Sequence, residues 1–486
     1  MTEVVDFGEI VLVVAVGFTL ALLSTKVTQR VPIPAPAIFL LAAALASDLF
    51  PALAEHTSIR TVERIGVVAL IVILFDGGMK IGWRRTRQVA APVALLGVVG
   101  TFATAGLMAV LAHAFFDFDW TVAWILGAAL APTDPAVMFS ILGNKEVGGR
   151  SGTILEGESG GNDPVGIALV VGMLDFATHE DASVWTIVKD FSVDMVVGLA
   201  IGIVGAALLL QLMRRVSLPS EGLYAVRTLV AASVIYGVAS LAHGSGFLAV
   251  FVAGLLIGDA RAPFKREIER FQDALASLAE ITVFAALGLT FHFSDLAKNQ
   301  IWLDGILLAV LLGLLVRPLV VYALLAPMRM RWAEKTFIAW TGLKGAVPIL
   351  LATFVVLQGL DGGPRIYNIV VVVVLFSVVV QGSTVPLAAR RLGIPMRVHE
   401  LEPYSLYVGL QEEPEGVVHY RVAPKTHAAN RRVRDLSIGD STWISLIVRD
   451  GVPIQPRGSS TIRVGDEVLV LTEPADELTV RRIFEG

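Results

Sequence analysis

Glu158-Ser-Gly-Gly-Asn-Asp-Pro164 leads directly into the apolar run Val165–Leu174, a pattern typical of a helix at membrane depth. A charged side chain there costs about 2.5–3.5 kcal/mol on insertion scales, so Asp163 is a candidate functional residue. The alternative is a structural charge that a partner on another helix neutralises. We favour function because a second acidic motif, Pro132-Thr-Asp-Pro135, also interrupts an apolar run.

The composition around this stretch indicates a polytopic membrane protein. Of 486 residues, 55% are hydrophobic and 17% are charged, whereas soluble proteins carry about 25% charged residues. The net charge of −5 argues against a nucleic-acid partner. The absence of cysteine excludes disulfides and thiolate chemistry. We expect no enzyme activity and no cofactor, because the sequence has no nucleotide loop, metal motif or Ser/His/Asp order.

Hydropathy predicts thirteen membrane spans, since a crossing helix needs about 20 mostly apolar residues. The candidates are 8–25, 34–51, 64–82, 89–114, 120–143, 152–177, 190–214, 224–242, 246–260, 274–294, 302–327, 335–358 and 366–390. The fold class expected is therefore an all-α polytopic membrane domain.

Basic residues gather in alternate loops, as Lys and Arg do on the cytoplasmic side of a membrane. These residues are Lys26, Arg30, Arg84, Arg85, Arg87, Lys145, Arg150, Arg214, Arg215, Arg261, Lys265, Arg266, Arg270, Arg329, Arg331, Lys335, Arg390 and Arg391. We expect the N-terminus outside and the C-terminal part in the cytoplasm, with the chain in the inner membrane of a bacterial cell.

The chain becomes polar after Arg391, and we expect a membrane domain over 1–395, a linker over 396–415 and a small α+β domain over 416–486. Predicted strands lie near 417–422, 443–448 and 467–472, and predicted helices near 428–436 and 473–484. No GxGxxG follows a strand, which argues against a dinucleotide fold.

Two of the predicted spans contain helix breaks. Ala131-Pro-Thr-Asp-Pro135 places two prolines around Thr-Asp, and Trp340-Thr-Gly-Leu-Lys-Gly-Ala-Val-Pro348 combines glycine, proline and a charge. Proline removes a helical donor, and half-helices of this kind surround the midplane site of many transporters. The alternative for the first motif is a simple kink with Asp134 satisfied locally. The two breaks hint at a repeat without establishing one.

Helical spacing assigns the polar side chains of the span 152–177 to faces. Glu158 and Asn162 share one face, and Ser159 and Asp163 share another, because residues i and i+4 are neighbours. Glu158 needs a buried cation, and Arg317 is the best candidate because a lone arginine in an apolar span requires a partner. We interpret this pair as structural.

Oxygen ligands suit a dehydrated alkali cation, and Asp163, Ser159, Asp134 and Thr133 can supply them. Because a carboxylate removed from water can hold either a proton or a cation near neutral pH, competition for Asp163 is a sufficient basis for exchange. Asn162 belongs to the predicted ion-binding group but adds no negative charge. Asp76 either lines an access funnel or caps a helix end, and neither role is favoured.

These segments resemble the signature motifs of NhaP-type monovalent cation/proton antiporters, the electroneutral branch. The resemblance covers residues of about 8–390 and includes Gly342-Leu-Lys-Gly-Ala-Val-Pro348. It implies thirteen helices, an inverted repeat with crossing broken helices, a homodimer and an elevator-type movement. By motif position it implies ion binding at Asp163, Asp134, Thr133 and Ser159, and the Glu158–Arg317 pair. Lys344 departs from the arginine usual in that motif, which puts any bidentate contact in doubt.

Residues of about 415–486 resemble the TrkA-C or RCK-C module of potassium-transport proteins. The similar stretches are 434–438, 447–451 and 464–470. This resemblance favours K⁺ over Na⁺ as the transported ion. It implies regulation by the domain, with a cyclic dinucleotide or another small ligand as an effector.

Electroneutral K⁺(Na⁺)/H⁺ exchange is therefore the favoured function. The alternative is a gated monovalent cation channel, although the sequence contains no segment similar to Thr-Val-Gly-Tyr-Gly. A membrane hydrolase is a third possibility, and no motif supports it.

Overall fold

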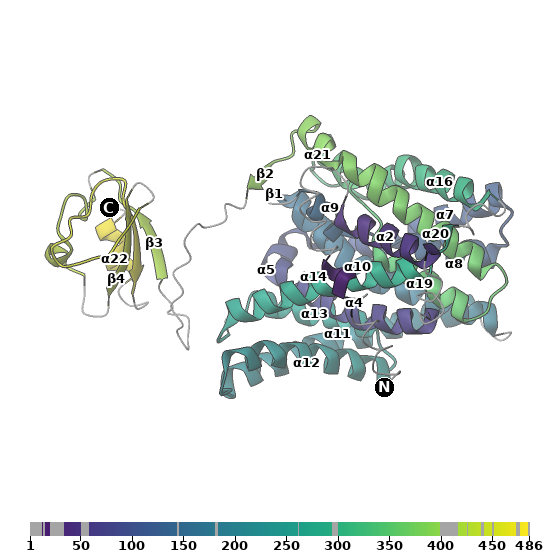
Figure 1. Cartoon of the computed structure of the whole chain (residues 1–486), viewed down its shortest axis with the longest axis horizontal. Helices are drawn as coiled ribbons and strands as arrows, with labels where there is room; N and C mark the ends of the chain where they lie inside the picture. The colour runs from purple at the N-terminus through teal and green to yellow at the C-terminus, as the bar shows by residue number, and fades with distance from the viewer. Residues whose placement is uncertain are drawn as a thin grey trace. The chain divides into compact units, whose positions relative to one another are not determined.

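The computed structural model describes residues 12, 15–19, 34–49, 58–142, 145–179, 183–260, 262–293, 300–398, 417–424, 426–438, 442–449, 452–472 and 477–484. The chain forms two compact units, one within residues 1–403 and the other mainly within 404–486. Figure 1 shows that the first unit is helical and the second is built around a sheet.

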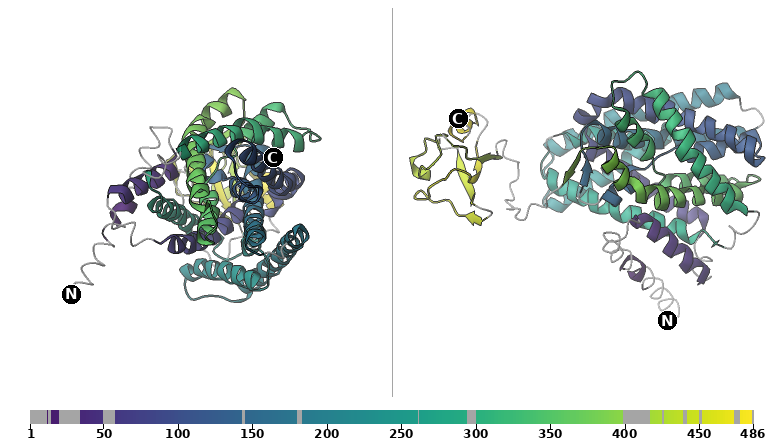
Figure 2. Two further views of the ribbon diagram at one scale, coloured as in Figure 1. Left: turned by 90° about the vertical axis from the view of Figure 1, so that its right-hand side faces the viewer. Right: turned by 90° about the horizontal axis from the view of Figure 1, so that it is seen from above.

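The first unit consists of helices that lie side by side, as the views of Figures 1 and 2 show. Its longer helices are α2 (Ala35–Leu49), α4 (Ile59–Ile81), α7 (Thr101–Phe116), α8 (Trp120–Leu130), α10 (Arg150–Thr178), α11 (Val184–Arg215), α12 (Glu221–Leu241), α13 (Gly246–Gly258), α14 (Lys265–Leu289), α16 (Ile301–Leu311), α19 (Ala346–Leu357) and α20 (Gly363–Phe376). Its shorter helices are α5 (Trp83–Thr86), α6 (Ala90–Ala94), α9 (Pro135–Leu142), α17 (Arg317–Leu324), α18 (Trp332–Trp340) and α21 (Gly382–Arg391), with a 3₁₀ turn η1 (Arg87–Val89).

Seven helical segments of the described residues are long and apolar enough to cross a membrane. They are 83–116, 120–142, 185–215, 221–241, 265–289, 301–324 and 363–391. Three shorter apolar helices, α2, α13 and α19, accompany them. The predicted class, a helical membrane protein with a small C-terminal α+β domain, is confirmed. The span 8–25 lies mostly outside the described residues, and the count of thirteen and the inverted repeat remain predictions.

Two of the predicted spans are broken in the structure. The span 120–143 consists of α8 and α9, with non-helical backbone at 131–134 between them. The span 335–358 consists of α18 and α19, separated at 341–345. Non-helical backbone at membrane depth needs partners inside the protein, so both breaks require polar groups from other helices.

The helices of the first unit pack into two groups. One group contains α2, α4 and α11–α14, which contact one another extensively. The other contains α6–α10 and α16–α21, in which α7 packs on α8, α16 and α19 pack on α20, and α9 packs on α21. Helix α10 contacts members of both groups, including α4, α13, α8 and α19. The motif that contains Asp163 is therefore at the centre of the packing.

A short antiparallel ladder connects two distant parts of this unit. Strand β1 (Lys145–Val147) follows α9 and precedes α10, and it pairs with β2 (Met396–Val398). The Gly148 N–H extends the ladder by donating to the Pro395 carbonyl, with 2.7 Å between the two atoms. The first residues of the expected linker 396–415 are thus a strand held against the loop between the two site helices.

The C-terminal unit is a four-stranded antiparallel sheet with one helix. Its strands, in the order β3-β6-β4-β5, are β3 (Val417–Arg421), β6 (Glu467–Leu471), β4 (Trp443–Arg449) and β5 (Val452–Ile454). Helix α22 (Glu477–Phe484) closes the core, where the rings of Phe484 and Tyr420 stack with centroids 5.2 Å apart. The three predicted strands and the last helix are confirmed.

The helix predicted near 428–436 is wrong, because this segment forms turns and a 3₁₀ turn, η6 (Val433–Asp435). Its backbone donors bond to other segments: the Ala428 N–H donates to the Ile483 carbonyl, and the Asn430 N–H to the Ile462 carbonyl. Asn430 also has a φ of 62°, in the left-handed region. The tertiary contacts therefore replace the i to i−4 bonds of a helix.

Candidate functional site

The first helix break receives much of its hydrogen bonding from the second. The Lys344 ammonium donates to the carbonyls of Ala131 and Pro132, at 2.9 Å each. The Asp134 N–H donates to the Leu343 carbonyl, at 2.8 Å. The two breaks lie against each other and satisfy groups that a continuous helix would satisfy internally.

Helix α10 satisfies the remaining groups of the first break through Thr133. The Ser159 hydroxyl donates to the Thr133 carbonyl at 2.6 Å. The Asn162 amide nitrogen donates to the Thr133 hydroxyl oxygen at 2.7 Å, and the amide oxygen accepts the Thr133 N–H at 3.3 Å. All three side chains are buried. Ser159 and Asn162 therefore fix the position of Thr133.

Asp134 is at the start of α9, where one of its oxygens caps the helix. Oδ1 accepts the Ala136 N–H at 2.8 Å. The other oxygen, Oδ2, faces Gly345, and a Cβ atom at that position would overlap it. A glycine at 345 is therefore what allows the carboxylate to lie against the second break.

Asp163 has no comparable partner. Its side chain is buried, and Oδ1 has no hydrogen-bond partner among the described residues. The carboxylate interacts electrostatically with Asp134, which repels it, and with Lys344, which attracts it. Because a buried acceptor without a partner carries an unrecovered desolvation cost, Asp163 is suited to bind a proton or a cation.

Glu158, five residues earlier on α10, has a cationic partner at ion-pair distance. Arg317 contacts it in a bidentate ion pair, with Nη1 2.6 Å from Oε1 and Nη2 2.8 Å from Oε2. The residues are 1% and 3% exposed, so the pair is fully desolvated. A Cβ atom at Gly342 would collide with the Arg317 guanidinium. The second break thus leaves room for this pair as well as for Asp134.

Three π-helical turns border these contacts. They are η2 (Leu95–Gly100), η4 (Leu312–Val316) and η5 (Ser377–Gln381). The first packs on α10, the second ends immediately before Arg317, and the third bonds to the second break. π-Helical turns occur frequently at functional sites. The sequence contains no signal for them, because one extra residue in a turn leaves the hydropathy of a span unchanged.

The second break is bonded to η5. The Lys344 N–H donates to the Ser377 hydroxyl at 3.1 Å, and this hydroxyl donates to the Gln381 side-chain oxygen at 3.1 Å. The Gln381 amide donates to the Trp340 carbonyl at 2.5 Å. Ser377 and Gln381 were not identified from the sequence, since neither is charged and both lie in an otherwise apolar run.

These contacts explain how lysine functions where the motif usually has arginine. The Lys344 ammonium bonds to two carbonyls at the C-terminal end of α8, a position that favours positive charge. An ammonium with three rotatable donors is sufficient for two separate carbonyls, whereas a planar fork is needed for a carboxylate.

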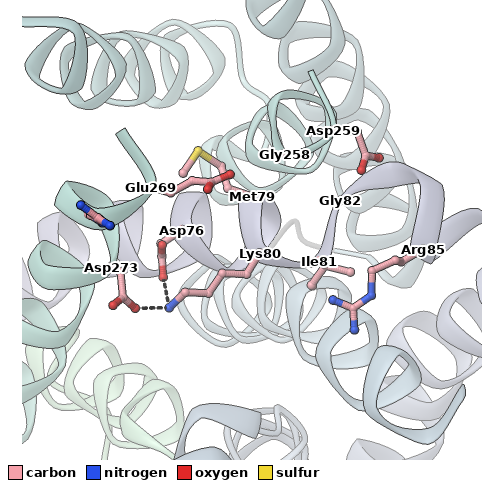
Figure 3. Close-up of a pocket in the computed structure, with 11 residues that line it drawn as sticks. Asp76, Met79, Lys80, Ile81, Gly82, Arg85, Gly258, Asp259, Glu269 and Asp273 are labelled. Atoms are coloured by element: carbon pink, nitrogen blue, oxygen red, sulfur yellow. Dashed lines mark hydrogen bonds and ion pairs between the residues drawn. The ribbon is translucent and has the colours of Figure 1, made fainter. Parts of the chain in front are cut away.

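Asp76 lies apart from this cluster, in a pocket of about 430 Å³ between α4, α13 and α14. Its Oδ2 is 2.7 Å from the Lys80 ammonium, which also lies 2.6 Å from Asp273 of α14. Figure 3 shows the Lys80 ammonium next to both carboxylates, and Glu269 also lines the pocket. Both roles considered for Asp76, lining an access funnel and capping a helix end, remain predictions.

Sequence reasoning missed Glu280 of α14. It is the charged residue within the otherwise apolar segment 274–289, and a charge at that depth was the available signal. No group of three or more His, Cys, Asp or Glu side chains suited to a metal ion occurs within the part of the chain that the structure describes.

Comparison with known families assigns both units. Residues 15–391 match the family described as "Sodium/hydrogen exchanger, transmembrane", and residues 417–485 match the TrkA-C domain. The two matches do not overlap, and each corresponds to one of the two compact units of the structure.

Individual proteins are similar over 74–96% of this chain. A K(+)/H(+) antiporter NhaP2 of Shewanella sp. (strain ANA-3) is 32% identical over 96% of this chain and 81% of its own. A K(+)/H(+) antiporter NhaP of Alkalimonas amylolytica is 30% identical with the same coverage. The Na(+)/H(+) antiporter ApNhaP of Aphanothece halophytica is 28% identical over 74% of this chain and 71% of its own.

A solved structure has the same fold. The sodium proton antiporter MjNhaP1 from Methanocaldococcus jannaschii superposes with a TM-score of 0.70 at 22% identity. The alignment covers 80% of this chain and 99% of that chain.

Proposed function

This chain belongs to the sodium/hydrogen exchanger family as an NhaP-type monovalent cation/proton antiporter, and on that premise we propose that it exchanges K⁺ for H⁺. Na⁺ is the second candidate cation. The K⁺ assignment is supported by the names of the relatives that match almost the whole chain and by the TrkA-C domain. The more partial match is to an Na(+)/H(+) antiporter.

One observation carries the assignment of the site: Asp163 combines burial with a carboxylate oxygen that has no hydrogen-bond partner in the described ranges. We assign to it the alternating binding of cation and proton. Asp134, Thr133 and Ser159 provide further oxygen ligands. Asn162 acts by holding Thr133, since both ends of its amide bond to that residue.

The Glu158–Arg317 pair and Lys344 support the site rather than bind the ion. A cation at Asp163 compensates its carboxylate, whereas the Glu158 carboxylate is already compensated. One positive charge for one proton at a single carboxylate makes the exchange electroneutral.

Movement of one helix group against the other fits an elevator-type mechanism. The group α6–α10 and α16–α21 contains Asp163, Asp134 and Lys344, and it would carry the site. The group α2, α4 and α11–α14 would stay fixed and include the homodimer interface. We place the chain in the bacterial inner membrane with its N-terminus outside and the C-terminal unit in the cytoplasm.

We further propose that the TrkA-C domain, over residues 416–486, regulates exchange through the linker 396–415. The β1–β2 ladder supports this proposal, because β2 begins the linker and β1 separates the helix after Asp134 from the helix that contains Asp163. A domain can bias transport only through contacts that differ between states, and this ladder offers a route for such a bias. A cyclic dinucleotide is the effector class that the resemblance implies.

The decisive experiment is cation-dependent dissipation of a pH gradient in proteoliposomes, with K⁺, Na⁺ and Li⁺ compared at equal concentration. We expect saturable dissipation, strongest with K⁺, that generates no membrane potential. Conductance that does not saturate and that needs no proton gradient would instead indicate the gated channel. Absence of a response to all three cations would contradict the proposal.

A further inference from the structure

Glu280 of α14 is partly buried, and its carboxylate takes part in none of the contacts described above. Its Oε1 is shielded from solvent and has no hydrogen-bond partner among the described residues. A structural carboxylate at membrane depth is expected to have a cationic partner, as Glu158 has in Arg317. Glu280 therefore differs from Glu158 and resembles Asp163.

The position of Glu280 connects it to the pocket of Figure 3. Glu269 and Asp273 line that pocket and lie eleven and seven residues before Glu280 on α14. Spacings of four and seven residues keep side chains on one face of a helix. Glu280 thus continues the acidic face of the pocket two turns, or about 10 Å, further along the helix.

The charges around Glu280 extend this path to the candidate site. The Glu280 carboxylate interacts electrostatically with Lys80, which lines the pocket, and with Asp134 at the first break. Asp134 in turn interacts with Asp163. Glu280 therefore has charged neighbours both in the pocket, at Lys80, and at the first break, at Asp134.

We propose that Glu280 is a transit site for the transported cation, an inference that rests on the proposed function. A cation that leaves the water of the pocket loses ligands, and carboxylate oxygens replace them. Glu280 coordinates the cation without any covalent bond being made or broken. The cation then passes to Asp134 and Asp163. Because α14 belongs to the other helix group, Glu280 contributes when the site faces the pocket and is not a permanent ligand.

The test measures the K⁺ concentration that gives half-maximal exchange in proteoliposomes at one fixed pH. Glu280→Gln keeps the size of the side chain and removes its charge. We expect the half-maximal concentration to rise about tenfold, the effect of losing one charge-assisted contact, with a smaller change in maximal rate. Glu280→Asp keeps the charge and should stay within about threefold of the wild type.

Two controls separate this inference from the proposed function. Glu267→Gln removes a carboxylate of the same helix that lies roughly 140° around its axis from Glu280, and it should leave the half-maximal concentration unchanged. Asp163→Asn should abolish exchange regardless of the role of Glu280. A wild-type protein that does not respond to any cation would refute the proposed function itself.

The outcomes for Glu280 are distinct. An unchanged half-maximal concentration in folded Glu280→Gln protein overturns the transit site, and so does a reduced maximal rate alone, which would indicate a structural role. If Glu280→Gln does not fold, Glu280→Ser and Glu280→Asp provide the comparison. A rise with serine that aspartate reverses supports the proposal, and equal values for the two variants overturn it.

Discussion

Glu158 and Asp163 are both buried on α10, five residues apart, yet their carboxylates have opposite surroundings. Both oxygens of Glu158 contact Arg317, at 2.6 and 2.8 Å. Asp163 makes no ion pair with the described residues, and its Oδ1 has no hydrogen-bond partner among them. Under the proposed function, one helix therefore carries both a carboxylate that is paired for structural support and an unpaired carboxylate that is available for a cation or a proton.

The C-terminal unit repeats the compensated arrangement outside the membrane. Arg449 donates from Nε and Nη2 to the two oxygens of Asp466, at 2.9 and 2.8 Å, and the Arg463 N–H donates to the same carboxylate at 2.7 Å. Burial raises the pKa of Asp466, but the bonds from Arg449 and Arg463 outweigh it and hold the pKa below its usual value. Asp466 therefore belongs with Glu158 as a structural carboxylate.

The largest effect is expected for Asp163→Asn, which should reduce exchange to the level of empty liposomes. Asparagine fills the same space but cannot alternate between a cation and a proton. The measurement is K⁺-driven dissipation of a pH gradient at matched protein density, together with thermal unfolding to verify the fold. Robust exchange by the folded variant would remove Asp163 from the assigned role.

The second effect concerns stability. Glu158→Ala and Arg317→Ala should each lower the free energy of unfolding by about 3–5 kcal/mol, because each leaves a buried charge without its partner. Asp163→Asn should cost much less. Thermal unfolding in detergent orders the three variants.

A double-mutant cycle tests the pair itself, and a half-exposed pair in the same unit provides the control. Glu158→Ala combined with Arg317→Ala should show a coupling energy well above zero. The control is the pair of Asp304 and Arg365, which lie 2.8 Å apart and are partly accessible to solvent. Its coupling energy should be about 0–1 kcal/mol in the same type of cycle. Equal coupling in the two cycles would contradict the distinction drawn for Glu158.

The third effect tests the compensated carboxylate of the C-terminal unit. Because the folded-state pKa of Asp466 is lowered, its contribution to stability is present above its unfolded pKa and is lost as the pH falls through the folded value, below about pH 4. Asp466→Asn should cost about 1.5–3 kcal/mol at neutral pH, the value of hydrogen bonds to a charged group.

Denaturation of residues 416–486, which have their own apolar core, measures this effect as a function of pH. Asp435→Asn serves as the matched control, since Asp435 forms an exposed 3.8 Å pair with Arg434 and is expected to contribute little. Identical pH profiles for Asp466→Asn and the wild type would show that Asp466 is not stabilising in its ionised form.

The smallest effect on exchange is expected from removal of the tail, because every proposed ion ligand precedes it. Chains that end at Val398 and at Pro395 differ by the strand β2. Both should exchange cations, with a shift of about 0.5 pH unit in half-maximal activity, equivalent to about 0.7 kcal/mol of bias between states. The shift should be larger without β2. Superimposable profiles for all three proteins would exclude regulation by the tail under those conditions.

Local chemistry made much of the fold predictable. Prolines 132 and 135 and the Gly-Leu-Lys-Gly stretch at 342–345 predict broken helices because they remove donors or interrupt packing within one segment. Alternating apolar residues predict β3, β4 and β6 in the same way. The turns at 428–436 were not predictable, because several of their bonding partners lie elsewhere in the chain. The short β5 pairs with the neighbouring β4, but its three residues are too few to give a periodic signal.

The sequence by itself determined that this chain spans a membrane, that two spans break near acidic or basic residues, and which family its motifs resemble. Each of these properties depends on runs of neighbouring residues. Only the tertiary structure decided that Lys344 bonds to carbonyls at 131 and 132, more than 200 residues earlier, and that Oε1 of Glu280 has no hydrogen-bond partner within the described ranges. Whether a buried charge is compensated depends on distances between helices, because hydrogen bonds and ion pairs act over a few ångströms in space and not along the chain.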